Sequence, residues 1–178
     1  MINDQIATYM RLRNNPVYVT GLRDLIACLP ANLVMAEIGV FGGESTRMFL
    51  GSGKVKRHFA IDPWRQYDWP CPFDWQDVYD TFMAYAKDKP EIAVLRMPSL
   101  EAAAYIADAS LDFVYIDGDH SYRAARADIE TWRPKVRAGG FLGGHDLSEA
   151  FPGVGQALLD TRIGFGTQFR DTSWLVRV

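Results

Sequence analysis

The sequence predicts an α/β fold: a doubly wound, mostly parallel sheet of seven strands that ends in a C-terminal antiparallel hairpin. Short apolar runs alternate along the chain with longer segments of helical periodicity. Several of these runs end in an acidic residue or a glycine-rich turn, as strands do at the ligand-binding edge of an open α/β sheet. The tail instead alternates as two short strands around a turn near Asp171 and Thr172.

The composition predicts one domain over residues 1–178, with an N-terminal helical segment over residues 1–30. A chain of 178 residues that is 48% hydrophobic and 23% charged can bury a substantial core. The net charge of -3 argues against a nucleic-acid binder, which would display a basic surface, so a small molecule is the expected partner. The oligomeric state stays open, with a homo-oligomer as one option.

Neither the cysteines nor the apolar runs point to an extracellular or membrane setting. Cys28 and Cys71 are far apart and form no Cys-x-x-Cys pair, so we expect neither a disulfide framework nor a zinc site. The first residues lack a basic region followed by an apolar core, and no apolar run approaches transmembrane length. We therefore expect a soluble, cytoplasmic protein that has no membrane partner.

Each predicted element follows from its periodicity and from the Pro, Gly and capping residues at its ends. The second helix, for example, is predicted to be capped by Thr20 and ended by Pro30. The predicted strands are the run ending at Glu37, then residues 55–61, 92–97, 111–116 and 141–144, and the hairpin over 167–178. The predicted helices span residues 1–14, 20–29, 74–87, 101–108, 122–132 and 153–162, with one more opening at Glu44.

The first candidate ligand site is the turn after the first strand, Glu37-Ile38-Gly39-Val40-Phe41-Gly42-Gly43. Gly39 and Gly43 would let the backbone turn tightly and lie against a ligand, and Ser45 or Thr46 could cap the following helix. A pyrophosphate prefers bare amides, whereas an acid two residues before the first glycine suits a cationic amino-acid group. The rival interpretation is a tight strand-to-helix turn without a ligand.

Polar residues also follow the second and third strands. Asp62 ends the second strand, where a carboxylate can accept hydrogen bonds from both hydroxyls of a ribose. An Asp that only ends a strand before Pro63 is an equally good interpretation. Ser99 follows the third strand and could reach the edge of an adenine ring, or it could cap the next helix.

An aromatic, proline-containing segment spans residues 64–75. Its composition excludes regular structure throughout, because seven aromatic or proline residues fall within a dozen positions. At the ligand-binding edge such a loop could shape or close an acceptor pocket. A subunit contact and a hydrophobic plug are equally compatible with the sequence.

The fourth and fifth strands end in the densest groups of ionisable residues, Asp117-Gly118-Asp119-His120-Ser121-Tyr122 and His145-Asp146. Because the carboxyl ends of neighbouring parallel strands meet at one edge, these carboxylates and imidazoles are expected to lie together. His120 could act as a general base there. It could instead cap the helix that follows.

Taken together, these motifs resemble class I S-adenosylmethionine-dependent methyltransferases over nearly the whole chain from Leu33 onward. Within that class, the second motif followed by Trp-x-Pro, Gly-Gly and His-Asp is similar to small bacterial enzymes related to macrocin and rhamnosyl O-methyltransferases and to cephalosporin-hydroxylase-like proteins. The resemblance implies a Rossmann-like sheet and S-adenosylmethionine as the cofactor. It also implies cofactor-binding roles: Glu37 and Gly39 at the methionine end, Asp62 at the ribose and Ser99 at the adenine. Gly43 and Asp117 are further cofactor-binding candidates.

Several relatives of that class bind magnesium through an Asp that ends the fourth strand and an acidic pair that ends the fifth. The matching positions here are Asp117, His145 and Asp146. Magnesium prefers hard oxygen ligands, so the imidazole of His145 departs from the pattern and weakens the case for that metal. Magnesium, another divalent cation such as manganese, and no metal all remain open.

The chemistry of methyl transfer assigns provisional catalytic roles. A sulfonium already activates the methyl group, so the protein must align the acceptor and, for a hydroxyl, accept its proton. Asp117 with Asp146 could hold a cation that lowers the pKa of the hydroxyl. Alternatively, His120 or His145 could act directly as the general base.

The leading functional hypothesis is an O-methyltransferase that acts on a small hydroxylated acceptor of the sugar or natural-product type. An NAD-dependent oxidoreductase on a similar sheet is the second hypothesis, although the Glu-x-Gly spacing argues against it. A third is a catalytically inactive module that keeps the nucleoside pocket and works through interactions. The identity of the acceptor is not encoded in the sheet, because acceptor recognition lies in variable loops.

Overall fold

The computed structural model describes residues 2–13, 15–65 and 71–178. Residues 66–70, which fall in the aromatic segment discussed above, lie outside the described residues, so its predicted roles are followed only through the flanking positions. Within the described ranges, no helix combines the length and the apolar character that crossing a bilayer requires.

The centre of the molecule is a seven-stranded sheet with the order β3-β2-β1-β4-β5-β7-β6. The first five strands run parallel, and β7 pairs antiparallel with both β5 and β6. The predicted fold class, with its terminal hairpin, is confirmed. The strands are β1 (Leu33–Ile38), β2 (Val55–Ile61), β3 (Ile92–Leu95), β4 (Leu111–Ile116), β5 (Val136–Gly144), β6 (Thr167–Gln168) and β7 (Trp174–Arg177).

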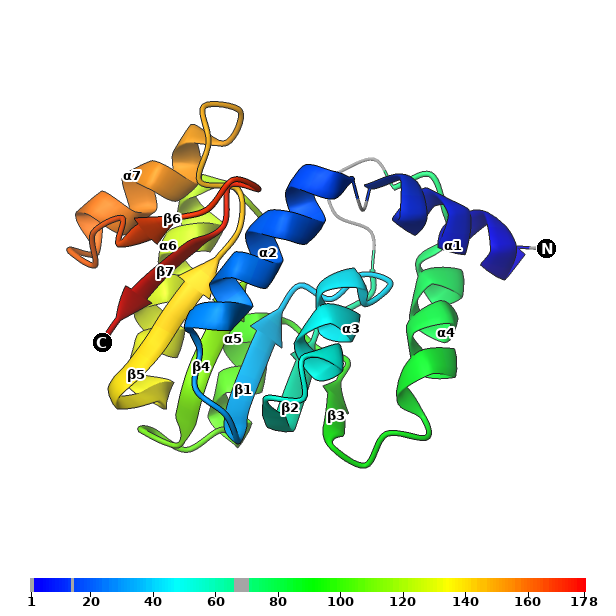
Figure 1. Ribbon diagram of the computed structural model, residues 1–178, viewed down its shortest axis with the longest axis horizontal. Helices are drawn as coiled ribbons and strands as arrows, with labels where there is room; N and C mark the ends of the chain where they lie inside the picture. The colour runs from blue at the N-terminus through cyan, green and yellow to red at the C-terminus, as the bar shows by residue number, and fades with distance from the viewer. Residues whose placement is uncertain (1, 14, 66–70) are drawn as a thin grey trace.

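Helices cover both faces of the sheet (Figure 1). Residues of α5, α6 and α7 pack in one core cluster with the sheet, whereas α2 and α3 pack on the opposite face, and α1 packs with α4 beside them. The helices are α1 (Ile2–Arg13), α2 (Pro16–Cys28), α3 (Glu44–Gly51), α4 (Trp75–Ala86), α5 (Ser99–Ala102), α6 (Tyr122–Trp132) and α7 (Pro152–Asp160), with short 3-10 turns at Ala103–Tyr105 and Arg133–Lys135.

Several predicted boundaries are wrong; for example, the helix predicted over residues 101–108 is α5 (Ser99–Ala102) followed by the 3-10 turn Ala103–Tyr105. Helix α2 begins at Pro16 because Asn15 is its N-cap: the Asn15 side-chain oxygen accepts hydrogen bonds from the amides of Val17 and Tyr18 at 2.9 and 3.0 Å. Thr20 lies inside the helix and donates to the carbonyl of Pro16. Strand β5 begins five residues earlier than predicted, at Val136, and includes Gly139 and Gly140.

The fold brings the carboxyl ends of β1, β2, β4 and β5 to one edge of the sheet. The N-terminal half of α2 lies above this edge in Figure 1, beside α1. Polar residues at these strand ends therefore share one region, and α2 provides part of its cover. That region holds the candidate site.

Candidate active site

A cavity of about 1130 Å³ opens at the carboxyl edge of the sheet. Its walls come from the ends of β1, β2, β4 and β5, from the starts of α2, α3 and α6, and from the turn between β6 and β7. This volume suits a drug-sized ligand with room for a second molecule. The predicted site residues that line it are Gly39, Asp62, Ser99, Asp117, His120, His145 and Asp146, whereas Glu37 and Gly43 do not.

Gly39 forms the tight turn that leaves β1. Its φ is +85°, and a Cβ added there would lie 2.2 Å from the carbonyl oxygen of Asp117. Only glycine fits this left-handed position against a neighbouring backbone. The bare backbone of Gly39 therefore forms cavity wall beside the end of β4.

Gly43 has a different position. It is the N-cap of α3 with a φ of +86°, and a Cβ there would lie 2.7 Å from the ring of Phe82 on α4. Its small size therefore allows α3 to start close to α4. The first turn of α3 contributes Glu44 and Ser45 to the cavity wall in its place.

Glu37 is fully buried beneath the cavity. Its carboxylate accepts hydrogen bonds from the hydroxyls of Ser45 and Thr46, and one oxygen lies 2.8 Å from Nε2 of His58, outside hydrogen-bond geometry. Glu37 thus anchors the first turn of α3, whose Ser45 lines the cavity. His58 lies inside β2, where no sequence motif marks it as a partner of Glu37.

Asp62 lies at the cavity wall and fastens the glycine turn. Its Oδ2 accepts hydrogen bonds from the amides of Val40 and Phe41, both at 3.0 Å, and its Oδ1 accepts one from the amide of Trp64 at 2.7 Å. Burial raises the pKa of this carboxyl, although the three amides act in the opposite direction. Asp62 therefore couples the end of β2 to the turn after β1.

Ser99 does not cap α5, because Pro98 occupies the N-cap position. Its hydroxyl donates instead to Oδ1 of Asp128 on α6, and both residues line the cavity. Asp128 is only 5% exposed, and burial raises its pKa to about 6 despite the hydrogen bond from Ser99. Asp128 could not be singled out from the sequence, because it lies in the middle of a helix among other charged residues.

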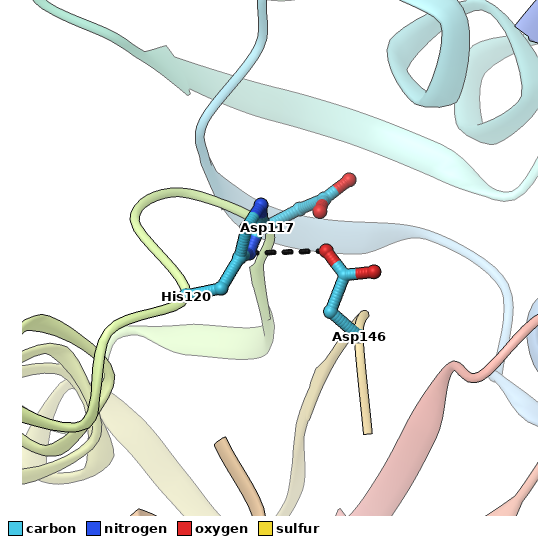
Figure 2. Close-up of side chains that lie close together, drawn as sticks. All are labelled: Asp117, His120 and Asp146. Atoms are coloured by element: carbon cyan, nitrogen blue, oxygen red, sulfur yellow. Dashed lines mark ion pairs between the residues drawn. The ribbon is translucent and has the colours of Figure 1, made fainter. Parts of the chain in front are cut away.

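The ends of β4 and β5 bring two carboxylates and two imidazoles together. Nδ1 of His120 lies 3.0 Å from Oδ2 of Asp146 (Figure 2). Nδ1 of His145 lies 3.1 Å from Oδ1 of Asp146 and 3.8 Å from Oδ1 of Asp117. The helix-capping interpretation of His120 is wrong, because Ser121 caps α6 by accepting a hydrogen bond from the amide of Ala124.

The His145 ring is surrounded by carboxylates. Besides Asp117 and Asp146, the buried Asp171 approaches Nε2 to 3.9 Å, and the ring of Tyr18 packs edge-on against the imidazole. Burial lowers the pKa of His145, but the carboxylates together outweigh it and raise the pKa to about 9. At neutral pH this imidazole is therefore protonated and acts as a hydrogen-bond donor.

The potential metal ligands that converge are Asp117, His120 and Asp146, which offer atoms within 4.8 Å of one another (Figure 2). The predicted set contained His145 in place of His120. Two carboxylates and one imidazole form a mixed oxygen and nitrogen donor set, which suits manganese or a similar divalent ion better than magnesium.

The two ends of the aromatic segment have different surroundings. Trp64 is 1% exposed and stacks on Phe82 of α4, with ring centroids 5.4 Å apart, so it plugs the core. Trp75 lines the cavity and meets the ring of Phe41 edge-on. The plug and pocket interpretations therefore each hold for one end of the segment.

Solved methyltransferase structures share this architecture. The crystal structure of a S-adenosylmethionine-dependent methyltransferase from Aquifex aeolicus matches with a TM-score of 0.63 and 12% identity, over 96% of each chain. The apo structure of a TDP-rhamnose 3'-O-methyltransferase of calicheamicin biosynthesis matches with a TM-score of 0.58 and 14% identity, over 99% of this chain and 92% of that chain. At these identities the likeness concerns the fold.

Sequence comparison is more specific. The uncharacterized protein y4gI of Sinorhizobium fredii is 33% identical over 149 residues, which cover 81% of this chain and 16% of that protein, so the chain spans only a small part of its relative's length. A family model described as a methyltransferase domain matches residues 36–147. This range is more than half of the chain and runs from β1 to just beyond His145 and Asp146. The chain therefore belongs to this methyltransferase domain family.

Proposed function

We propose that this protein is a S-adenosylmethionine-dependent methyltransferase that methylates a hydroxyl group of a small acceptor of the sugar or natural-product type. The observation that carries the proposal is a single cavity that unites the Gly39 turn and Asp62 with the His120 and Asp146 pair. The description of the Aquifex aeolicus protein supports the cofactor, and that of the TDP-rhamnose 3'-O-methyltransferase supports a hydroxyl acceptor.

The cofactor fits along the wall formed by the first three strand ends. The glycine turn offers bare backbone to the methionine end, next to Ser45, which Glu37 positions from below. In this proposal the ribose meets Asp62 and the adenine meets Ser99; both residues line the cavity, and Ser99 begins α5. Bound there, the cofactor supplies a methyl group already activated by its sulfonium.

His120 is the proposed general base. Since Nδ1 faces Asp146 at 3.0 Å, the neutral ring carries its proton on Nδ1 and accepts a proton at Nε2. With the cofactor bound, Nε2 of His120 would take the proton of the acceptor hydroxyl while the acceptor oxygen accepts the methyl group from the sulfonium. The products are the methyl ether and S-adenosylhomocysteine.

His145 has the complementary role. Because it is protonated at neutral pH, Nδ1 of His145 donates to Asp146 at 3.1 Å, and the charged ring attracts Asp117 at 3.8 Å. It is therefore a positioning residue in this mechanism. Asp146, held from one side by His145, presents its second oxygen to His120.

A divalent cation is compatible with the same cluster. Asp117, His120 and Asp146 would hold it, and it would lower the pKa of the acceptor hydroxyl. An imidazole that binds a metal cannot also accept the proton, so the cation and the His120 base are alternative routes at one place.

Calorimetry and a transfer assay test the proposal. We expect S-adenosylmethionine and S-adenosylhomocysteine to bind and NAD not to bind, and tight binding of NAD alone would refute the proposal. Transfer of a labelled methyl group to a panel of sugars, nucleotide sugars and hydroxylated natural products, with Mn²⁺, with Mg²⁺ and after chelation, distinguishes an enzyme from an inactive binding module and the base route from the cation route.

A further inference from the structure

The proposed mechanism uses one side of the cavity and gives no task to the other. In the sheet, β5 and β7 lie on the side of β4 opposite β1 and β2, whose ends form the proposed cofactor wall. The side away from the cofactor is formed by the starts of α2 and α7 and by the turn between β6 and β7, with the lining residues Val17, Ala150, Phe151, Pro152, Arg170 and Thr172. An acceptor that reaches His120 beside a bound cofactor has this side left to bind to.

This side of the cavity is tied to the loop that carries His120. The amide of Leu147 donates to the carbonyl of Thr172 at 3.0 Å, which joins the segment after β5 to the β6–β7 turn. A Cβ added to Gly153, in the first turn of α7, would lie 3.0 Å from the carbonyl oxygen of His120. The start of α7 therefore packs directly against the loop, which fixes this wall next to the proposed base.

Phe151 provides an apolar surface beside the base. Its ring centroid lies 4.6 Å from that of the His120 imidazole, yet Phe151 is 38% exposed and lines the cavity. Val17, which is 55% exposed, adds a second apolar side chain to the lining. Large apolar side chains left open in a cavity beside a few polar groups are typical of ligand-binding surfaces. A ring-shaped acceptor packed on Phe151 would bring its substituents next to His120.

Arg170 provides a positive charge on the same side. It is an exposed residue of the β6–β7 turn, in which the amide of Phe169 donates to the carbonyl of Ser173 at 2.8 Å and the amide of Thr172 donates to the carbonyl of Phe169 at 3.1 Å. In the part of the chain that the structure describes, the guanidinium of Arg170 has no ion-pair or hydrogen-bond partner. A guanidinium offers a planar pair of donors that matches two oxygens of a carboxylate or a phosphate. Arg170 can therefore pair with an anionic group of a ligand.

The other charges of the cavity direct an anion to this place. Next to Asp117 and Asp146 an anion would be repelled, and the protonated His145 is already compensated by these carboxylates. Arg65, the second arginine of the lining, follows β2 on the cofactor side. On the acceptor side the attraction for an anion therefore comes from Arg170.

We infer that the methyl acceptor carries an anionic group, a phosphate or a carboxylate, that pairs with Arg170 while a ring of the same molecule packs on Phe151. The inference rests on the proposed function and deepens it, since it names the class of the acceptor. The ring on Phe151 presents its hydroxyl to His120, and the anion lies away from the carboxylates around the base. Arg170 is therefore a specificity residue that selects the acceptor by charge and takes no part in the proton transfer.

Binding of small matched probes to the complex of the protein with S-adenosylhomocysteine, measured by calorimetry, tests the inference. One set is phenol, phenyl phosphate and benzoate, and the other is methyl glucoside, glucose 1-phosphate and glucuronate. In at least one set, the wild-type complex should bind an anionic member about 5- to 10-fold more tightly than the neutral member, the range expected for an ion pair that is partly shielded from water. A preference confined to phosphates or to carboxylates supports the inference and identifies the source of the anion.

Substitutions separate the role of the charge from that of the ring. Arg170→Ala should remove the preference, whereas Arg170→Lys should keep part of it, because an ammonium keeps the charge but not the planar pair of donors. Phe151→Ala should weaken the binding of neutral and anionic members alike. Arg123→Ala is the matched control, because Arg123 is an exposed arginine of α6 that does not line the cavity, and it should keep the wild-type preference.

Equal affinities of the wild-type complex for charged and neutral probes, or a preference that survives in Arg170→Ala, overturn the inference. A wild-type complex that binds none of the probes at millimolar concentration overturns it too. In each of these cases the proposed function stands, because S-adenosylhomocysteine is already bound. A wild-type protein that binds neither S-adenosylmethionine nor S-adenosylhomocysteine refutes the proposed function itself.

Discussion

Glu37 and Asp128 are both buried carboxylates, and their partners separate their roles. Glu37 has the hydroxyls of Ser45 and Thr46 and the edge of His58 around it, so it is committed to the core. Asp128 accepts a hydrogen bond from the hydroxyl of Ser99, and its side chain lines the cavity. Strand alternation anticipates the first case: Glu37 points to the same face as Met35, the face covered by α2 and α3, and so lies beneath the ligand edge.

Replacement of the proposed base tests the chemistry at a single residue. His120→Gln should lower the rate of methyl transfer by on the order of 10²- to 10⁴-fold, because an amide cannot accept the proton. The affinity for S-adenosylhomocysteine should stay within about 2-fold, since His120 is not placed on the cofactor wall in the proposal. Steady-state rates with the acceptor found in the panel, together with calorimetry, measure both effects. A variant with the wild-type rate would exclude His120 as the base.

Titration of Asp128 should also make the free energy of unfolding depend on pH. Its folded-state pKa of about 6 lies above the unfolded value, so the folded state binds the proton more tightly, and the stability gained this way is lost as pH rises from about 4 through 6. Asp128→Asn removes this titration. From about pH 5 to pH 7.5, the stability of the variant should therefore improve relative to the wild-type protein by about 1 kcal/mol.

Urea denaturation of both proteins at the two pH values measures this difference. Asp112→Asn serves as the control, because Asp112 pairs with Arg137 and lies away from the cavity. A constant difference between Asp128→Asn and wild type across this range would show that the carboxyl of Asp128 titrates normally.

At the scale of elements, strand ends were easier to predict than helix starts. The positions of Asp62 and Asp117 followed from apolar runs that stop at an acid, and parallel pairing brought them to one edge. Helix α2 was harder, because Asn15 and Thr20 both offer side-chain oxygens and only the path of the chain decides between them. Asn15 precedes a proline, which is favoured in the first turn of a helix.

The assignment of the α2 cap can be measured directly. Asn15→Ala should lower the free energy of unfolding by about 1 kcal/mol, because the amides of Val17 and Tyr18 lose their acceptor. Thr20→Ala, at an exposed position inside the helix, should change it by less than about 0.5 kcal/mol. Chemical denaturation distinguishes the two variants, and a larger loss for Thr20→Ala would restore Thr20 as the residue that fixes the start of the helix.

Two glycines with left-handed backbone can be compared: Gly39 in the turn between β1 and α3, and Gly53 in the loop between α3 and β2. Gly53→Ala puts a side chain on a backbone with a φ of +69° but with open space around it, and should lower the free energy of unfolding by about 1 kcal/mol. Gly39→Ala adds a contact of 2.2 Å with the Asp117 backbone, so it should cost more than Gly53→Ala and also weaken the binding of S-adenosylhomocysteine. Thermal unfolding and calorimetry check both effects. Equal costs and unchanged binding would mean that the backbones of Gly39 and Asp117 can separate freely.

At the scale of the whole molecule, the site residues at strand ends could be predicted from the sequence, whereas those on a helix and in the hairpin turn could not. Asp117, His145 and Asp146 could be placed because each lies at a strand end, and strand ends converge by topology. Asp128 and Asp171 could not, because a helix interior and a hairpin turn reach the cavity only through long-range packing. The membership of His120 in the carboxylate cluster depends on the path of one loop, which periodicity does not describe.

Because segments from α2 to the final hairpin form the cavity, a bound ligand should stabilise the chain as one unit. At about 100 times its Kd, S-adenosylhomocysteine should raise the free energy of unfolding by about 2.7 kcal/mol. For a domain of this size, that corresponds to an increase in Tm of roughly 5–10 °C. Scanning fluorimetry should show one transition that moves with the ligand, and NAD should leave it in place. Asp62→Asn should reduce the shift, because an amide with one oxygen cannot serve all three backbone donors that hold the glycine turn. If the ligand raises the Tm of Asp62→Asn as much as that of the wild-type protein, the glycine turn held by Asp62 does not contribute to ligand binding.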